Sequence, residues 1–186
     1  MRKVAITGNI ASGKSTVENI LKSKGFKVLD TDLVGHKLLE NNKRVLDAFK
    51  SYDITVDGKI SREKLGKIVF EDSEKLQLLN SILHPEITKK VELFFEQNNS
   101  ESILFVSIPL LFESNMQNMF DKIIFVYADD EIRLERLIKR NGYTKEYALK
   151  RLQAQMPQEE KIKKCDFVIK NNGPLEDLPA QIELCL

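Results

Sequence analysis

The chain has 186 residues, a length typical of one domain with a single substantial core. Lysine and arginine total 29 and aspartate and glutamate total 28, so the net charge of +1 gives no electrostatic reason to expect nucleic acid or a membrane as a partner. The chain has only two cysteines, and no apolar run approaches the roughly 20 residues of a membrane span. These features predict a soluble cytoplasmic protein, and a monomer is the default expectation.

Five short apolar runs are predicted to be buried strands, and helical patterns separate them. The runs cover residues 3–7, 27–30, 103–108, 122–127 and 167–169. Runs that are apolar throughout are typical of a parallel sheet with helices on both faces. A helix expected over residues 14–23, with Val17, Ile20 and Leu21 on one face, joins the first two strands in a βαβ unit. The predicted fold is therefore α/β, with a five-stranded parallel sheet sandwiched by helices.

Two helical regions interrupt the predicted sheet. Residues 33–98 have amphipathic helical patterns and no comparable strand, and we interpret them as an acceptor-binding insertion. Residues 131–164 have a second helical pattern with a break at Asn141-Gly142, which suits a lid. Residues 1–32, 99–130 and 165–186 form the expected core. No repeat or linker-like composition divides the chain, so a single domain covering residues 1–186 is predicted.

The most specific motif lies between the first strand and the first helix. Its sequence, Gly8-Asn9-Ile10-Ala11-Ser12-Gly13-Lys14-Ser15, matches the phosphate-binding pattern G-x-x-x-x-G-K-[ST]. The glycines let backbone N–H groups surround a phosphate, and the helix N-terminus adds positive potential. Lys14 is expected at the β- and γ-phosphates, the Ser15 hydroxyl at Mg²⁺ and the Thr16 hydroxyl near the α-phosphate. A P-loop NTPase fold that binds ATP with Mg²⁺ is therefore predicted.

The phosphate loop alone does not define a reaction, because GTPases, motors and kinases all have it. No Asn-Lys-x-Asp guanine motif is present, which favours a small-molecule kinase. Transfer to a hydroxyl needs a carboxylate at the acceptor, and Asp32 follows the second strand, at the edge where parallel sheets bind ligands. Asp30 lies two residues earlier. For either carboxylate a second interpretation stays open, namely a cap for the helix expected to begin near Leu33.

Three arginines recur at helical spacing in the expected lid. Arg133, Arg136 and Arg140 are suited to offset the charge of a transferring phosphoryl group. A solvated helix face, paired with Glu131 and Glu135, explains the same spacing. On spacing alone, that second interpretation is the simpler one.

Taken together, the motifs resemble those of the dephospho-CoA kinase family over residues 7–173. The matching elements, besides the phosphate loop, are Asp30-Thr31-Asp32, Asp57-Gly58-Lys59-Ile60-Ser61-Arg62, His84-Pro85, Pro109-Leu110-Leu111-Phe112-Glu113, Arg136, Arg140, Arg151, Gln155 and Asp166 to Gly173. Enzymes of that family transfer the γ-phosphoryl group of ATP to the ribose 3′-hydroxyl of dephospho-CoA, the final step of CoA biosynthesis. The chain departs from the family pattern at His36, where the family usually has arginine.

The resemblance implies a role for each matched residue. It implies that Asp32 is the acceptor base, that Thr7 and Lys14 lie at the transferring phosphate, and that Arg140 stabilises its charge. The implied ATP contacts are the loop residues Gly8 to Thr16 with Arg136, Arg140 and Asn172, and the implied dephospho-CoA contacts are Asp32, Arg62, His84, Leu110 and Glu113. Local alternatives stay open, because His84 also suits a helix start before Pro85 and Glu113 suits a strand-to-helix turn.

Two other functions are compatible with these residues. One is a nucleoside or nucleotide kinase of the same fold, which would accept a bare nucleotide. The other is an ATP-binding regulator that transfers nothing. A base, a loop lysine and lid arginines occurring together argue against the regulator, since a sensor needs no acceptor carboxylate.

Overall fold

The computed structural model describes residues 1–186, and the chain forms two units. Unit 1 comprises Met1–Asp30 and Gln97–Leu186, and unit 2 comprises Thr31–Glu96. Each unit has its own cluster of buried apolar side chains.

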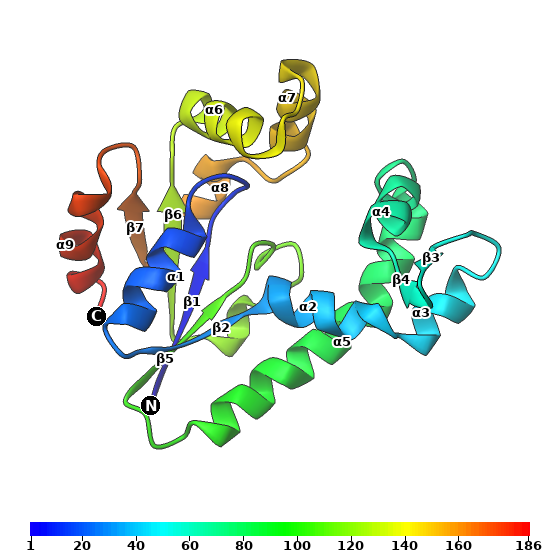
Figure 1. Ribbon diagram of the computed structural model, residues 1–186. Helices are drawn as coiled ribbons and strands as arrows, with labels where there is room; N and C mark the ends of the chain where they lie inside the picture. Colours follow the sequence, from blue (N-terminus) through cyan, green and yellow to red (C-terminus); the bar gives the residue numbers. More distant parts are fainter. The chain divides into compact units, whose positions relative to one another are not determined.

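Unit 1 is organised around a parallel sheet of five strands (Figure 1). The strands are β1 (Arg2–Thr7), β2 (Lys27–Asp30), β5 (Ile103–Ser107), β6 (Lys122–Tyr127) and β7 (Phe167–Lys170), in the order β2-β5-β1-β6-β7. All five predicted strands are present. The chain places β2 and β5 on one side of β1 and β6 and β7 on the other, which creates a switch point beside β1 where ligands bind in such sheets.

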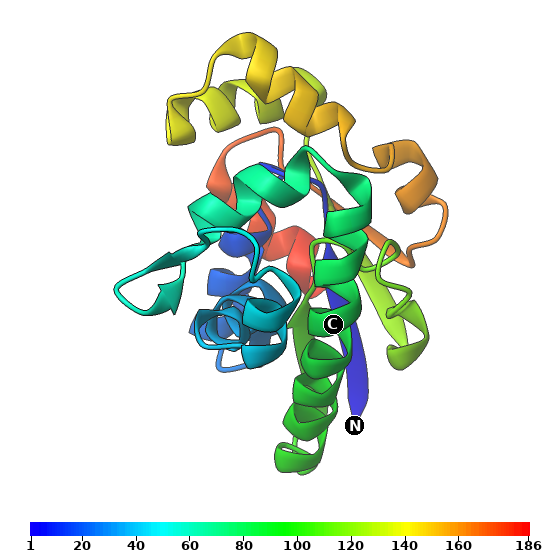
Figure 2. The same ribbon diagram turned by 90° about the vertical axis from the view of Figure 1, so that its right-hand side faces the viewer.

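Helices α1 (Lys14–Ser23) and α9 (Leu178–Glu183) pack against one face of this sheet. The shared core consists of Val4, Ile6, Val17, Leu21, Phe105, Ile124, Val126, Ile169, Leu178, Ile182 and Cys185. The two ends of the chain meet at the amino end of β1, where Arg2 Nη1 donates a hydrogen bond of 2.6 Å to the carbonyl of Leu186 (Figures 1 and 2). The opposite, carboxyl end of β1 is where the phosphate loop begins.

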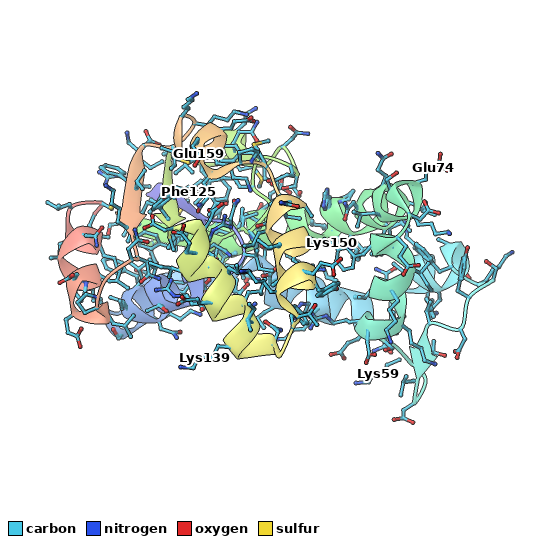
Figure 3. All side chains as sticks on the ribbon, turned by 90° about the horizontal axis from the view of Figure 1, so that it is seen from above. Lys59, Glu74, Phe125, Lys139, Lys150 and Glu159 are labelled. Atoms are coloured by element: carbon cyan, nitrogen blue, oxygen red, sulfur yellow. The ribbon has the colours of Figure 1, made fainter.

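Three further helices of unit 1 follow β6, namely α6 (Asp130–Asn141), α7 (Lys145–Gln153) and α8 (Gln158–Ile162). The predicted break falls between α6 and α7, at Gly142, whose φ of 67° a glycine adopts without strain. Leu137, Ala148 and Leu152 form the apolar centre of α6 and α7, and Ile10 and Ala11 of the phosphate loop pack against it. Lys139 and Lys150 lie at the periphery of these helices (Figure 3).

Unit 2 is mainly helical, as its sequence pattern indicates. It contains α2 (Thr31–Glu40), α3 (Lys43–Ala48), α4 (Arg62–Phe70) and α5 (Ser73–Gln97) around Val45, Phe49, Leu65 and Val69. The side chains of Asn42 and Ser61 cap α3 and α4 by accepting N–H bonds from Val45 and Lys64. No helix of either unit is long and apolar enough to cross a membrane.

Three local features of unit 2 differ from the sequence interpretation. A small antiparallel hairpin joins β3 (Thr55–Val56) to β4 (Lys59–Ile60), through Asp57 and Gly58 with φ of 50° and 76°. Pro85 lies inside α5, so the interpretation of His84 as a helix start is wrong. The helix expected near Leu33 begins at Thr31, which places Asp32 in its first turn rather than ahead of it.

Candidate active site

The phosphate loop occupies residues 8–13, between β1 and α1, and its two glycines are required by their surroundings. A Cβ on Gly8 would lie 2.5 Å from the carbonyl oxygen of Val126. Gly13 has a φ of 95°, and a Cβ there would collide with the side-chain amide of Asn171. Ala11 is also left-handed, with a φ of 62°. The loop is therefore tightly wrapped against the ends of β6 and β7, as a phosphate-binding loop requires.

Asn171, directly after β7, joins three parts of unit 1. Its Nδ2 donates to the carbonyl of Ser12 at 2.8 Å, and its N–H donates to the carbonyl of Tyr127 at 2.8 Å. Its own carbonyl accepts a bond from Arg136 Nη2 at 2.9 Å. Sequence reasoning selected the next residue, Asn172, whose side chain accepts the N–H of Asp129 at 2.9 Å. The only signal for Asn171 in the sequence is the Asn-Asn-Gly pattern after a strand. This pattern does not distinguish Asn171 from Asn172.

The segment between α7 and α8 also holds the phosphate loop. Gln155 Oε1 accepts the N–H of Ile10 at 2.7 Å, and Asn9 Nδ2 donates to the carbonyl of Met156 at 3.0 Å. The Ile10 N–H is therefore occupied by a side chain in this conformation. Gln155 belongs to the family-like pattern, but no local pattern indicates Ile10 as its partner.

The three spaced arginines have three different environments. Arg133 is 3% exposed, and its Nη2 lies 2.6 Å from Asp130. Arg136 reaches the end of β7, as described above. Arg140 is exposed, and its Nε donates to the side chain of Asn141 at 2.9 Å. Of the three, Arg140 is the cation most accessible to a ligand.

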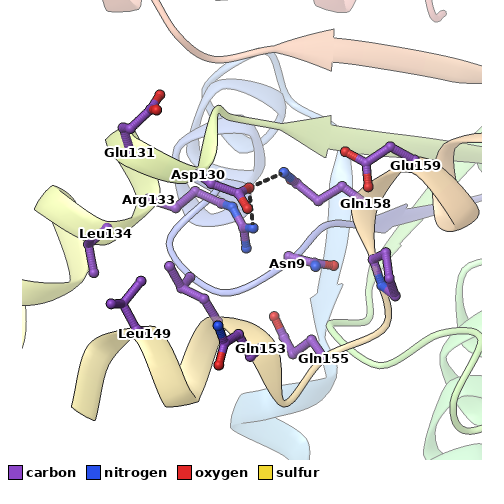
Figure 4. A pocket seen from close by; sticks show the side chains of 12 residues that line it. Asn9, Asp130, Glu131, Arg133, Leu134, Leu149, Gln153, Gln155, Gln158 and Glu159 are labelled. Atoms are coloured by element: carbon purple, nitrogen blue, oxygen red, sulfur yellow. Dashed lines mark hydrogen bonds and ion pairs between the residues drawn. The ribbon is translucent and has the colours of Figure 1, made fainter. Parts of the chain in front are cut away.

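A cavity of about 400 Å³ lies between α6, α7 and α8 and reaches Asn9 of the phosphate loop (Figure 4). Asp130 accepts hydrogen bonds there from Arg133 at 2.6 Å and from Gln158 Nε2 at 3.0 Å. Asn9 Oδ1, Gln158 Oε1 and two nitrogens of Arg133 have no partner in the protein, so they are suited to bind water. Residues of α6, α7 and α8 and of the segment between α7 and α8 line the cavity together with Asn9.

At the carboxyl edge of the sheet, β5 ends beside β1 and β2. The strand register aligns Ser107 with Ile6 on one side and with Asp30 on the other. Ser107 Oγ donates to Glu18 Oε1 of α1 at 2.6 Å, and Glu18 is only 5% exposed. Burial raises the pKa of Glu18, and the Asp30 charge adds to that shift. Sequence reasoning missed Glu18, because its partner lies 89 residues away.

The carboxyl end of β1, at the same edge of the sheet, carries the predicted phosphate-side threonine. Thr7 is fully buried, and its Oγ1 makes a long contact of 3.4 Å to the carbonyl of Pro109. Pro109 opens the segment that also contains Leu110 and Glu113. Leu110 is 41% exposed, and Glu113 forms an ion pair with Lys161 of α8 at 2.6 Å.

The remaining predicted acceptor residues belong to unit 2. Asp32 is exposed in the first turn of α2, and Arg62 is the exposed first residue of α4. His84 lies within α5, where burial lowers the pKa of its imidazole, so the ring is neutral near pH 7. Lys14 and Ser15 are the first two residues of α1 in unit 1.

Comparison with known proteins places the chain in a family. The family model described as dephospho-CoA kinase matches residues 2–177. A dephospho-CoA kinase of Carboxydothermus hydrogenoformans is 44% identical, over 96% of this chain and 90% of that protein. The solved dephospho-CoA kinase of Campylobacter jejuni is 34% identical, over 98% and 94% of the two chains, with a TM-score of 0.74. A shikimate kinase of Acinetobacter baumannii shares the fold, with a TM-score of 0.56 at 14% identity over 100% and 92%. The chain belongs to the dephospho-CoA kinase family.

Proposed function

We propose that this chain transfers the γ-phosphoryl group of ATP to the ribose 3′-hydroxyl of dephospho-CoA, giving CoA and ADP. The observation that carries the proposal is the phosphate loop, in a chain that matches the dephospho-CoA kinase family over residues 2–177. Val126 and Asn171 leave no room for a side chain at the two glycines of this loop. A tight loop of this kind binds the phosphates of a nucleotide through backbone N–H groups.

On the ATP side, the loop residues Gly8 to Thr16 hold the phosphates. Lys14 contacts the β- and γ-phosphates, and Arg140 offsets charge on the transferring group. Arg136 of the lid and Asn172 at the end of β7 also contact ATP. Gln155 must release the Ile10 N–H if that group is to reach a phosphate.

The residues around the loop fit Mg²⁺ as the metal that accompanies ATP. Ser15 is exposed at the start of α1, directly after the loop, and no group of three or more His, Cys, Asp or Glu side chains converges elsewhere. Mg²⁺ keeps several waters and is bound mainly by substrate phosphates with few protein ligands, and the Ser/Thr after the loop lysine is one such ligand in P-loop NTPases. When bound, Mg²⁺ neutralises charge on the β- and γ-phosphates. Ser15 is the residue that would hold it.

On the acceptor side, Asp32 takes the proton of the ribose 3′-hydroxyl as its oxygen bonds to the γ-phosphorus, and the bond from that phosphorus to the β,γ-bridging oxygen breaks to release ADP. Thr7 lies at the transferring phosphate. Arg62, His84, Leu110 and Glu113 bind the rest of dephospho-CoA. The two unpaired cysteines suit a reducing cytoplasm, and the net charge of +1 gives no electrostatic reason for a nucleic-acid or membrane partner; a monomer is the default proposal.

An acceptor panel tests the proposal. ADP release is measured with ATP and Mg²⁺ in the presence of dephospho-CoA, AMP, CMP or adenosine, and mass spectrometry of the product confirms one added phosphoryl group. Dephospho-CoA is expected to be the only efficient acceptor. Efficient turnover of a bare nucleotide would replace the proposal by a nucleotide kinase, and ATP binding without any turnover would favour a regulator.

A further inference from the structure

A fully buried lysine lies against the segment that follows β5. Lys161 of α8 is 0% exposed, and its Nζ lies 2.6 Å from Glu113 Oε1. The geometry is that of a close ion pair rather than an aligned hydrogen bond, so the ammonium donors have no well-directed acceptor in the protein. Both residues belong to unit 1. The sequence motifs include Glu113 but not Lys161.

The lysine is held in place from several directions. Gln158, one turn earlier in α8, donates to the carbonyl of Ala128 at 3.0 Å. The carbonyl of Lys161 accepts the N–H of Lys164 at 2.9 Å and the thiol of Cys165 at 3.1 Å. These contacts hold the backbone of α8, from which the Lys161 side chain extends, against the residue that follows β6 and the turn after α8.

The glutamate is on a segment that is equally well packed. Leu111 is 0% and Phe112 8% exposed, and the Ser114 N–H donates to the carbonyl of Leu110 at 2.9 Å. Lys164 Nζ lies 5.5 Å from the centre of the Phe112 ring, which adds a second cationic contact between the two segments. The Glu113 side chain is 27% exposed, and it forms its ion pair with Lys161.

This arrangement is unusual for a pair that only stabilises the fold. Burying an ammonium is costly, and an apolar side chain of similar length fills such a place at least as well when only packing is needed. Here the buried cation contacts one oxygen of a carboxylate whose side chain remains accessible. Such a contact fixes the direction of the other oxygen.

We propose that Lys161 is a positioning residue for acceptor recognition, which orients Glu113 so that Oε2 accepts a hydrogen bond from a hydroxyl, amide or amino group of the acceptor. The inference rests on the proposed function, which assigns Glu113 to the acceptor. It adds a residue of α8 to the site, and it predicts that the effect of Lys161 passes through Glu113 alone.

The test compares Lys161→Met with Lys163→Met, the matched control, because Lys163 is an exposed lysine two residues further along. Lys161→Met is expected to raise the KM for dephospho-CoA about 10- to 100-fold, the usual effect of losing one hydrogen bond to a charged group, and to leave the KM for ATP within about twofold. Lys163→Met is expected to change neither KM. Lys161→Arg, which keeps the charge, is expected to give an intermediate value.

A double-mutant cycle with Glu113→Gln shows whether the effect passes through Glu113. The double variant is expected to match Glu113→Gln alone. Equal increases in both KM values, or additive effects in the cycle, would overturn the inference. If Lys161→Met does not fold, Lys161→Arg and Glu113→Gln decide the question. The inference is rejected if the KM for dephospho-CoA is unchanged in both of these variants.

Calorimetric binding of dephospho-CoA separates this inference from the proposed function. If the unaltered protein binds and phosphorylates dephospho-CoA, the variants test Lys161 alone. If it binds without turnover, the proposed function fails, but the Kd values of the variants still test the inference. Absence of binding would overturn both.

Discussion

The side-chain amide of Asn171 donates a hydrogen bond of 2.8 Å to the carbonyl of Ser12, inside the phosphate loop. This bond links the end of β7 to a loop that begins at the end of β1, with β6 between the two strands. The amide occupies the space that a side chain at Gly13 would need. The loop conformation thus depends on a residue 159 positions away, which is more than a local glycine pattern specifies.

Gly13→Ala should therefore lose ATP binding, and Gly25→Ala should not. The two glycines have similar φ values of 95° and 88°, but a Cβ at Gly25 meets nothing within 4 Å. Both substitutions cost about 1 kcal/mol of backbone strain, but only the first displaces Asn171 and the loop. We expect the ATP dissociation constant of Gly13→Ala to rise by at least about 100-fold, measured by calorimetry, through lost phosphate N–H contacts. Equal ATP affinities in the two variants would contradict this account.

The strands and the phosphate loop were predictable because their information is local. Apolar runs locate the five strands, and the spacing of the glycines with Lys14 and Ser15 identifies the loop. The hairpin at Asp57-Gly58 was overlooked, although Asp-Gly is a strong turn signal, because its strands have only two residues each.

Other features were not predictable from local patterns. Pro85 lies within α5 although proline disfavours helix interiors, since tertiary packing overrides propensity. The contacts of Glu18 with Ser107 and of Lys161 with Glu113 join residues far apart in the chain. A single sequence contains no signal for such pairs, so the polar groups that orient the site become visible only in the fold.

Asp32→Asn tests the assignment of the acceptor base. The amide cannot accept the hydroxyl proton, so kcat should fall by about 10² to 10⁴ while the ATP dissociation constant stays nearly unchanged. Asp47→Asn is the matched control, because Asp47 is also an exposed helical aspartate of unit 2. Its kcat should equal that of the unaltered protein. A kcat for Asp32→Asn within about twofold of normal would remove Asp32 from the mechanism.

Glu18 should make the stability of the protein depend on pH in a definite direction. Its folded pKa lies above the usual 4.5, so the folded state retains a proton that the unfolded state has lost. The contribution of Glu18 is therefore fully present below pH 4.5 and is lost as the pH rises through the folded pKa. Glu18→Gln does not titrate, but its amide oxygen can still accept the Ser107 hydroxyl.

Thermal midpoints of Glu18→Gln and the unaltered protein, measured from pH 4.5 to 7.5 in steps of about half a unit, check this direction. The variant should gain stability relative to the unaltered protein as the pH rises. A constant difference would show that Glu18 has the same pKa in both states. A difference that changes in the opposite direction would show that the folded site favours the charged carboxylate.

Arg140→Met should separate a specific contact with the transferring phosphoryl group from the general effect of positive charge on α6. Lys139 is the matched control, because it is the preceding exposed cation on the same helix. If Arg140 stabilises charge that develops during transfer, Arg140→Met should lower kcat by about 10² to 10³. The thermal midpoint should change little, because the Arg140 side chain bonds to exposed Asn141. Lys139→Met should leave kcat near normal. Equal losses of kcat in the two variants, with the same dependence on ionic strength, would instead assign the effect to the electrostatic field of the helix. Such a long-range attraction is screened by salt and does not depend on which of the two cations is removed.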